Sequence, residues 1–107
     1  MLTIQTMNER DIQDALVRDF IEYFPAILHK SKAAIDQLDR KSIKHVMHQL
    51  KATVALFNGV PLYAEIAHLE NTIGNLNDRE VLLKAHAILH KSEVLHAEVL
   101  KFQNENK

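Results

Sequence analysis

The sequence predicts an all-α protein, an up-down antiparallel four-helix bundle with a short additional N-terminal helix. Three observations favour this fold class. Glycine and proline occur only twice each in 107 residues, whereas 47% of the residues are hydrophobic, so little interrupts long apolar-faced helices. Apolar residues recur at intervals of three and four, the period of a helix with one buried face. The last long stretch keeps that alternation for about three heptads, which suits the near-parallel packing of a bundle.

The N-terminal part of the chain is expected to form two helical pieces. Asn8 can cap a first helix with acidic groups in its first turn, and a helical apolar pattern then runs from Leu16 to Leu38. Pro25 lies inside this pattern, and an interior proline costs about 3 kcal/mol. We therefore expect a short first helix that ends near Phe24 and a second that restarts at Pro25, either separate or as one kinked rod.

The middle of the chain predicts a helix, a tight turn and a returning helix. Asp39 caps the first, whose apolar face comprises Ile43, Val46, Met47, Leu50, Val54 and Phe57. Gly59, in Asn58-Gly59, is the predicted corner, because helices commonly end where glycine takes a positive φ. Pro61 then suits the start of the returning helix. The apolar stripe of that helix comprises Leu62, Ile66, Leu69 and Ile73.

The last helix is expected to open at Asn77, with Asn77 as cap and Glu80 reciprocating three residues later. Its core-facing stripe is expected to comprise Val81, Ala85, Ile88, Ser92, Leu95, Val99 and Phe102. We also expect every phenylalanine in the core, namely Phe20, Phe24, Phe57 and Phe102.

Length and composition exclude several classes of protein. A chain of this length forms a single domain, residues 1–107, with one core that needs no metal or disulfide. The absence of cysteine excludes disulfides and thiol chemistry, and a formal net charge of −1 argues against a general nucleic-acid binder. The sequence contains no apolar run of membrane-spanning length and begins with no signal peptide. We expect a soluble cytoplasmic monomer without nucleic-acid or membrane partners.

His48 is the main candidate for chemistry. At about 100° per residue, it points nearly opposite the apolar face of its helix. Its neighbours on that outward face are Lys41, Lys44, His45, Lys51, Ala52 and Ala55. The lysines supply positive charge and the alanines permit close approach, so this face is expected to dock a partner. An ordinary solvated face is the alternative reading.

Glu70 is the expected partner of His48. His48 lies eleven residues before Gly59 and Glu70 lies eleven after it. An antiparallel helical hairpin that turns at Gly59 therefore places the two residues side by side. A carboxylate that accepts a hydrogen bond from one ring nitrogen fixes the tautomer and leaves the other nitrogen free as a nucleophile. A carboxylate in a surface ion pair is the alternative role.

These residues resemble the histidine-containing phosphotransfer (HPt) domains of two-component phosphorelays. The family pattern is roughly His-x-Leu-Lys-Gly-Ser/Thr, then a glycine about ten residues after the histidine, a leucine at fourteen, and Leu-Glu or Leu-Gln at twenty-one and twenty-two. The matching residues are His48, Leu50, Lys51, Thr53, Leu62, Leu69 and Glu70. Ala52 replaces the usual glycine, and Gly59 stands one place late. The resemblance covers about residues 16–73.

The resemblance implies a phosphoryl carrier and not an enzyme. His48 would accept the phosphoryl group from a receiver-domain aspartate and pass it to the aspartate of another receiver. Lys51, as an exposed cation, would neutralise the phosphoryl oxygens. The sequence shows no kinase ATP site and no acidic cluster near His48 to hold Mg²⁺, so the partner receiver is expected to bring the metal. The implied partners are receiver domains of a hybrid histidine kinase or a response regulator.

Two other functions stay open. His86 and His90 lie one turn apart on the last helix, with Glu93 on the same outward face, and such a set can bind zinc. However, three ligands on one exposed helix rarely converge on a tetrahedral ion. The other alternative is a helical adaptor without chemistry, which would keep its function if glutamine replaced His48.

Overall fold

A computed structural model describes residues 9–55 and 60–105 of the chain. The four long elements are α-helices, namely α2 (Glu9–Asp36), α3 (Arg40–Val54), α4 (Val60–Thr72) and α5 (Asp78–Glu105). A short 3-10 helix, η2 (Ile73–Asn75), follows α4 directly. The described part of the chain contains no strand, so the all-α prediction is confirmed.

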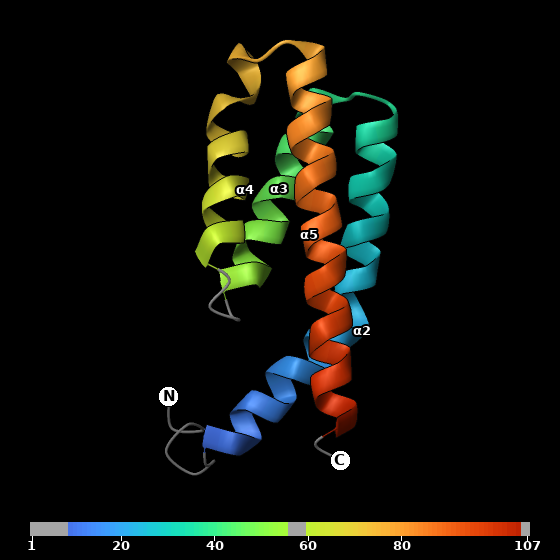
Figure 1. The fold of residues 1–107 in the computed structure, drawn as a ribbon, viewed down its shortest axis with the longest axis vertical. Helices are drawn as coiled ribbons and strands as arrows, with labels where there is room; N and C mark the ends of the chain where they lie inside the picture. The colour runs from blue at the N-terminus through green and yellow to red at the C-terminus, as the bar shows by residue number, and fades with distance from the viewer. Residues whose placement is uncertain (1–8, 56–59, 106–107) are drawn as a thin grey trace.

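The four helices pack into a bundle (Figure 1). α3 packs mainly on α2 and α4, and α5 packs mainly on the same two helices, so α3 and α5 lie diagonally opposite each other. Figure 1 shows the α2–α3 and α4–α5 connections at the same end of the bundle. At the other end, the first part of α2, drawn in blue, leaves the bundle at an angle.

Pro25 lies inside α2 without ending it. The helix break expected at Phe24 is therefore wrong. The two expected pieces form one helix that runs through Pro25. Pro25 has no N–H to offer the carbonyl of Ile21, four residues earlier. His96 of α5 donates to this carbonyl instead, with Nε2 3.3 Å from the oxygen. Its ring also stacks on that of Phe24, with centroids 6.2 Å apart. A side chain from another helix thus replaces the donor that proline lacks.

We expect His96→Ala to destabilise the wild-type protein more than it destabilises a Pro25→Ala variant. Alanine at position 25 restores the backbone N–H for the carbonyl of Ile21, so the imidazole is then no longer needed as a donor. The difference should be about 0.5–1.5 kcal/mol, the net contribution of one hydrogen bond. Urea unfolding of the wild type, both single variants and the double variant measures this coupling. Equal losses in both backgrounds would mean that His96 contributes only packing.

The predicted apolar faces of α3 and α4 form much of the core. The buried residues of these faces are Ile43, Val46, Met47, Leu50 and Val54 on α3, then Leu62, Ile66 and Leu69 on α4 and Ile73 in η2. The predicted core residue Phe57 and the predicted turn Asn58-Gly59 lie outside the described residues, as does the predicted cap Asn8.

The stripe of α5 is buried from Val81 to Val99, apart from the half-buried Leu95. Phe20 and Phe24 are buried in the core and stack on each other, with ring centroids 4.3 Å apart. The core position expected for Phe102 is wrong, because 60% of this residue is exposed. Phe102 lies in the last turns of α5, at the end of the bundle where α2 has turned away (Figure 1).

The helix starts predicted at Asp39 and Asn77 are confirmed. The Asp39 carboxylate accepts hydrogen bonds from the backbone N–H of Ser42 at 3.3 Å and from its hydroxyl at 2.9 Å. These bonds hold the pKa of Asp39 below its usual value. Asn77 accepts from the backbone N–H of Glu80 at 2.8 Å, while the Glu80 carboxylate accepts from that of Asn77 at 3.3 Å. This reciprocal pair is a capping box.

Across residues 9–55 and 60–105, no helix combines the length and the apolar composition that crossing a bilayer requires.

Candidate functional site

His48 lies midway along α3, on the side opposite the buried residues, and 67% of its side chain is exposed. Its Nδ1 is 3.0 Å from Oε2 of Glu70 on α4. An ionised carboxylate can only accept, so Nδ1 carries the proton and donates it. Nε2 then keeps its lone pair and is not engaged in any hydrogen bond with the described residues. The two helices therefore bring His48 and Glu70 together, as the equal spacing from Gly59 predicts.

Glu70 is held at both carboxylate oxygens. While Oε2 accepts from His48, Oε1 lies 2.7 Å from the Nζ of Lys51, one turn further along α3. The Lys51 ammonium is the main cause that holds the pKa of Glu70 below its usual value, and the hydrogen bond from His48 adds to it against the effect of partial burial. In return, the Glu70 carboxylate raises the pKa of Lys51. Both groups are charged at neutral pH, and the carboxylate is fixed between ring and ammonium.

Lys51 is not the exposed cation that the sequence suggests. Only 23% of its side chain is exposed, because α4 places the Glu70 carboxylate against its ammonium. The side chain of Glu70 itself is 12% exposed. Lys51 therefore forms an ion pair with the Glu70 carboxylate. It also lies within one helical turn of His48, the other partner of that carboxylate.

The outward face of α3 around the imidazole is open. The residues predicted to dock a partner are all exposed, namely Lys41, Lys44, His45, Ala52 and Ala55. Ala55 occupies the C-cap of α3, just beyond the last turn. Lys41 and His45 also line a groove of about 480 Å³ between α2 and α3. The structure thus leaves a basic surface with small side chains around Nε2.

Arg40 was not singled out by sequence reasoning, yet it ties the start of α3 to the segment that joins α4 to α5. From the first turn of α3, its guanidinium donates to the carbonyls of Ile73 at 2.6 Å and Leu76 at 2.7 Å. It also pairs with the carboxylate of Asp78 at 2.7 Å. Carbonyls at the end of a helix lack partners within the helix, so an arginine there satisfies them. Arg40 is two turns before His48, and the Ile73 carbonyl that it binds lies three residues after Glu70. An arginine in a first turn gives no signal of this in the sequence.

The alternative metal ligands lie elsewhere. His86, His90 and Glu93 are all exposed on α5. Among the residues that the structure describes, no three or more His, Cys, Asp or Glu side chains are grouped so that they could hold a metal ion.

Comparisons of this chain with protein-family models, curated protein sequences and solved structures gave no match. Its function is therefore inferred from the geometry of the site.

Proposed function

We propose that this protein is a phosphorelay carrier of the HPt type. It accepts a phosphoryl group on Nε2 of His48 from a receiver-domain aspartate and passes it to the aspartate of a second receiver. The observation that carries the proposal is the chain of contacts in which Lys51 holds Glu70 and Glu70 holds Nδ1 of His48. This arrangement prepares one exposed ring nitrogen as a nucleophile, which is what phosphoryl acceptance needs.

The fold and the motif add support. A bundle of packed helices with the histidine on an outward face agrees with what the HPt resemblance implies. The up-down antiparallel course of the helices belongs to this proposal, as do the cytoplasmic location and the monomeric state. The proposed partners are receiver domains of a hybrid histidine kinase or a response regulator.

The proposed transfer conserves atoms and charge. Nε2 attacks the phosphorus of the aspartyl phosphate, the N–P bond forms, and the P–O bond to the receiver breaks to leave a free carboxylate. The ring then bears positive charge, which the Glu70 carboxylate stabilises through the Nδ1 proton. Transfer to the second receiver reverses these bond changes. The receiver supplies the Mg²⁺ that shields the phosphoryl oxygens, so the carrier has no cofactor of its own and is not an enzyme.

Lys51 has two functions in this proposal. Its ammonium fixes the orientation of the Glu70 carboxylate, to which it lies 2.7 Å away. It also adds a positive charge within one turn of the acceptor nitrogen, where negative charge arrives with the phosphoryl group. Lys41 and Lys44 are more exposed and lie further along the same face, where they attract the acidic active site of a receiver.

Incubating the purified protein with a panel of phosphorylated receiver domains tests the proposal. We expect at least one receiver to label the protein with an acid-labile phosphate, and mass spectrometry to locate this phosphate on His48. Adding an unphosphorylated receiver should then remove it. Failure of every receiver to label the protein would contradict the proposal.

Ala55→Arg is expected to slow transfer about ten- to a hundredfold without lowering the melting temperature. The alanine is exposed at the end of α3, so a long side chain there would displace a docked receiver and misalign the reacting atoms. Quenched time courses measure the rate of phosphoryl transfer, and thermal melts measure the melting temperature. Ala97→Arg is the matched control, because Ala97 is exposed on α5. If both variants transfer phosphate like the wild type, the receiver docks on another face.

A further inference from the structure

Tyr63 of α4 is an aromatic residue beside the candidate site, and 40% of it is exposed. It lies seven residues before Glu70, so helical spacing puts both side chains on the same side of α4. At 1.5 Å per residue, the two residues are about 10 Å apart along the helix axis. Ala67 lies between them and is small and half-buried. Because Glu70 contacts His48, the side of α4 that carries Tyr63 faces α3 and the imidazole.

Electrostatics also place Tyr63 beside Lys51. The hydrogen bond to Glu70 is the main cause that raises the pKa of Lys51, and the Tyr63 hydroxyl adds to this rise. Figure 1 shows the end of α3 and the start of α4 at the same end of the bundle. Ala55 at the C-cap of α3 and Tyr63 in the first turn of α4 both lie there. The two helices therefore share one outer surface, the α3/α4 surface, which comprises Lys51, Ala55, Tyr63 and Ala67.

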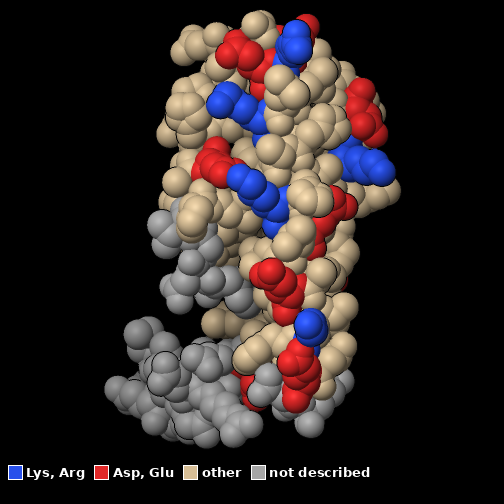
Figure 2. Space-filling view, viewed as in Figure 1, with Lys and Arg blue, Asp and Glu red and all other residues tan. Residues whose placement is uncertain are grey.

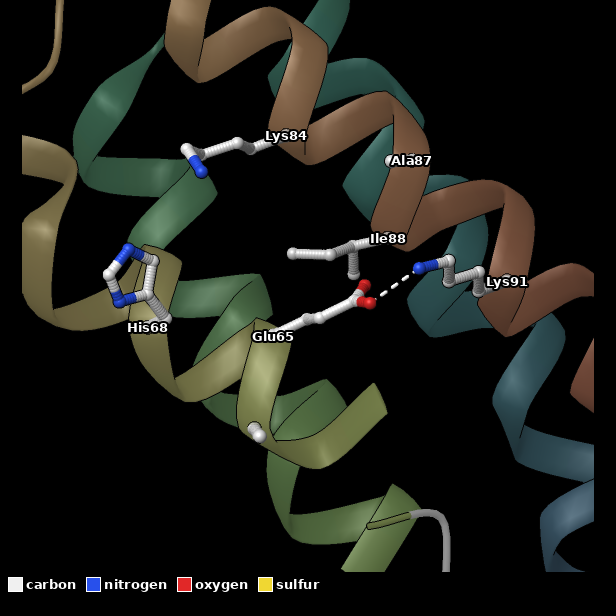
Figure 3. Close-up of a pocket in the computed structure, with 7 residues that line it drawn as sticks. Glu65, His68, Lys84, Ala87, Ile88 and Lys91 are labelled. Atoms are coloured by element: carbon white, nitrogen blue, oxygen red, sulfur yellow. Dashed lines mark hydrogen bonds and ion pairs between the residues drawn. The ribbon is translucent and has the colours of Figure 1, made fainter. Parts of the chain in front are cut away.

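Within the described helices α3 and α4, no carboxylate is left unpaired near this surface. α3 contains no acidic residue, and α4 contains only Glu65 and Glu70. Glu70 is held by His48 and Lys51. Glu65 points toward α5, where it pairs with Lys91 (Figure 3). By contrast, acidic and basic side chains are mixed over the face that α5 occupies (Figure 2). An acidic partner therefore meets no free negative charge at the α3/α4 surface.

A domain that transfers a phosphoryl group to Nε2 of His48 must lie over the α3/α4 surface. Specific protein interfaces cover about 800 Å² of each partner, and a round patch of that area has a radius of about 16 Å. Glu70 lies 3.0 Å from the imidazole, and Tyr63 is only about 10 Å further along α4. A patch centred on His48 therefore includes the ring of Tyr63. Tyrosine is among the residue types that contribute most to binding free energy at the centre of interfaces.

We propose that Tyr63 anchors the receiver and selects receivers that carry an apolar side chain about 10 Å from the phosphorylated aspartate. This inference rests on the proposed function, because it takes the receiver as the occupant of the surface. The ring is buried against that apolar side chain, while Lys41 and Lys44 attract the acidic residues around the aspartate. A receiver with an acidic side chain at the same place has to desolvate it against the ring. Such a receiver binds more weakly, although its phosphoaspartate is chemically the same.

Titration and transfer kinetics with Tyr63→Ala test the proposal. The probe is the receiver domain that labels the wild type fastest. We expect its Kd to rise about tenfold, which corresponds to ~1.4 kcal/mol, in isothermal titration calorimetry. The apparent KM for the phosphorylated receiver should rise by the same factor. The rate at saturating receiver should stay unchanged, because His48, Glu70 and Lys51 are all retained.

Two further variants at this position separate the ring from the rest of the side chain. Tyr63→Gln keeps a long side chain in a good helix former but lacks the ring, so it should lose as much affinity as Tyr63→Ala. Tyr63→Phe keeps the ring and should retain most of the affinity. Leu83→Ala is the matched control and should bind the receiver like the wild type. Leu83 is 63% exposed on α5, diagonally opposite α3.

Phosphoramidate separates docking from chemistry at the imidazole. This small phosphoryl donor needs no protein interface, so it should label His48 equally fast in the wild type and in Tyr63→Ala. Slower labelling of the variant would show that the ring acts through Lys51, and it would overturn the docking role.

Photo-crosslinking identifies the receiver side chain that meets the ring. With p-benzoylphenylalanine at position 63, irradiation should link the protein to an apolar residue of the receiver. The same group at position 83 should give no crosslink. Wild-type affinity of Tyr63→Ala, or a crosslink to an acidic residue, would overturn the role of Tyr63 and leave the proposed function intact. Absence of labelling of the wild type by every receiver would instead refute the proposed function, and with it the occupant of this surface.

Discussion

A variant with glutamine in place of His48 is expected to fold normally and to take up no phosphate from any receiver. The side chain is 67% exposed and outside the core, so the substitution removes only its contact with Glu70. Glutamine fills a similar space but has no nucleophilic nitrogen, and the acceptor is therefore lost outright. Uptake from labelled receivers measures the activity, and thermal unfolding monitored by circular dichroism verifies the fold.

His45→Gln is the matched control for this experiment. His45 lies three residues earlier on the same exposed surface, and the structure gives it no carboxylate partner among the described residues. We expect this variant still to take up phosphate, because His45 belongs to the docking face and not to the acceptor. Uptake by His48→Gln, or a label on His45 in the wild type, would contradict the assignment of the acceptor. A helical adaptor without chemistry would instead keep its function in His48→Gln.

Glu70→Ala is expected to lower the rate of phosphoryl transfer by one to two powers of ten, or about 1.4 to 2.7 kcal/mol of barrier. The variant removes the acceptor that lies 3.0 Å from Nδ1, so the ring is no longer held in the tautomer with a free Nε2. It also removes the negative charge that stabilises the ring once it carries the phosphoryl group. Rapid-quench kinetics with the best receiver measures the rate, and ¹⁵N NMR of the imidazole reports the tautomer.

Glu70→Gln separates these two contributions. Its amide oxygen can still accept from Nδ1, whereas its charge is lost, so the tautomer should persist and the rate should fall less than in Glu70→Ala. Wild-type kinetics and an unchanged tautomer in Glu70→Ala would show that the residue only forms a surface ion pair.

The same carboxylate should make the stability of the fold depend on pH. The pKa of Glu70 is lowered in the folded protein, chiefly by Lys51, relative to an ordinary value of 4.5. Its stabilising contribution is therefore fully present above pH 4.5 and is lost as the pH falls through the lower, folded value. The difference in free energy of unfolding between wild type and Glu70→Gln should shrink over that acid range, which urea unfolding at a series of pH values can follow.

Two features of this molecule follow directly from the sequence. The core faces of α3 and α4 are predicted correctly because helical periodicity is a local property that tertiary contacts here only reinforce. The contact between His48 and Glu70 follows from equal distances along the chain on either side of Gly59. Neither inference needs knowledge of the other helices.

The sequence predictions that fail concern contacts between different helices. The helix break expected at Pro25 does not occur, and His96 of α5 supplies the donor that the proline lacks. The exposure expected for Lys51 is wrong because a carboxylate on α4 lies against its ammonium. The hydrogen bonds from Arg40 join groups that only the folded bundle brings together. Each of these features depends on a pairing between helices, and nothing in the local sequence encodes it.

The bond from His96 to the carbonyl of Ile21 also bears on the order in which the chain folds. The two residues are 75 positions apart, so the donor arrives only after a long loop has closed. Until then, the carbonyl that Pro25 leaves without a partner must bind water. α3 and α4 are close in sequence and form a hairpin of low contact order, which favours their early association. The carbonyl of Ile21 in the middle of α2 therefore exchanges water for a protein donor only in the step that docks α5.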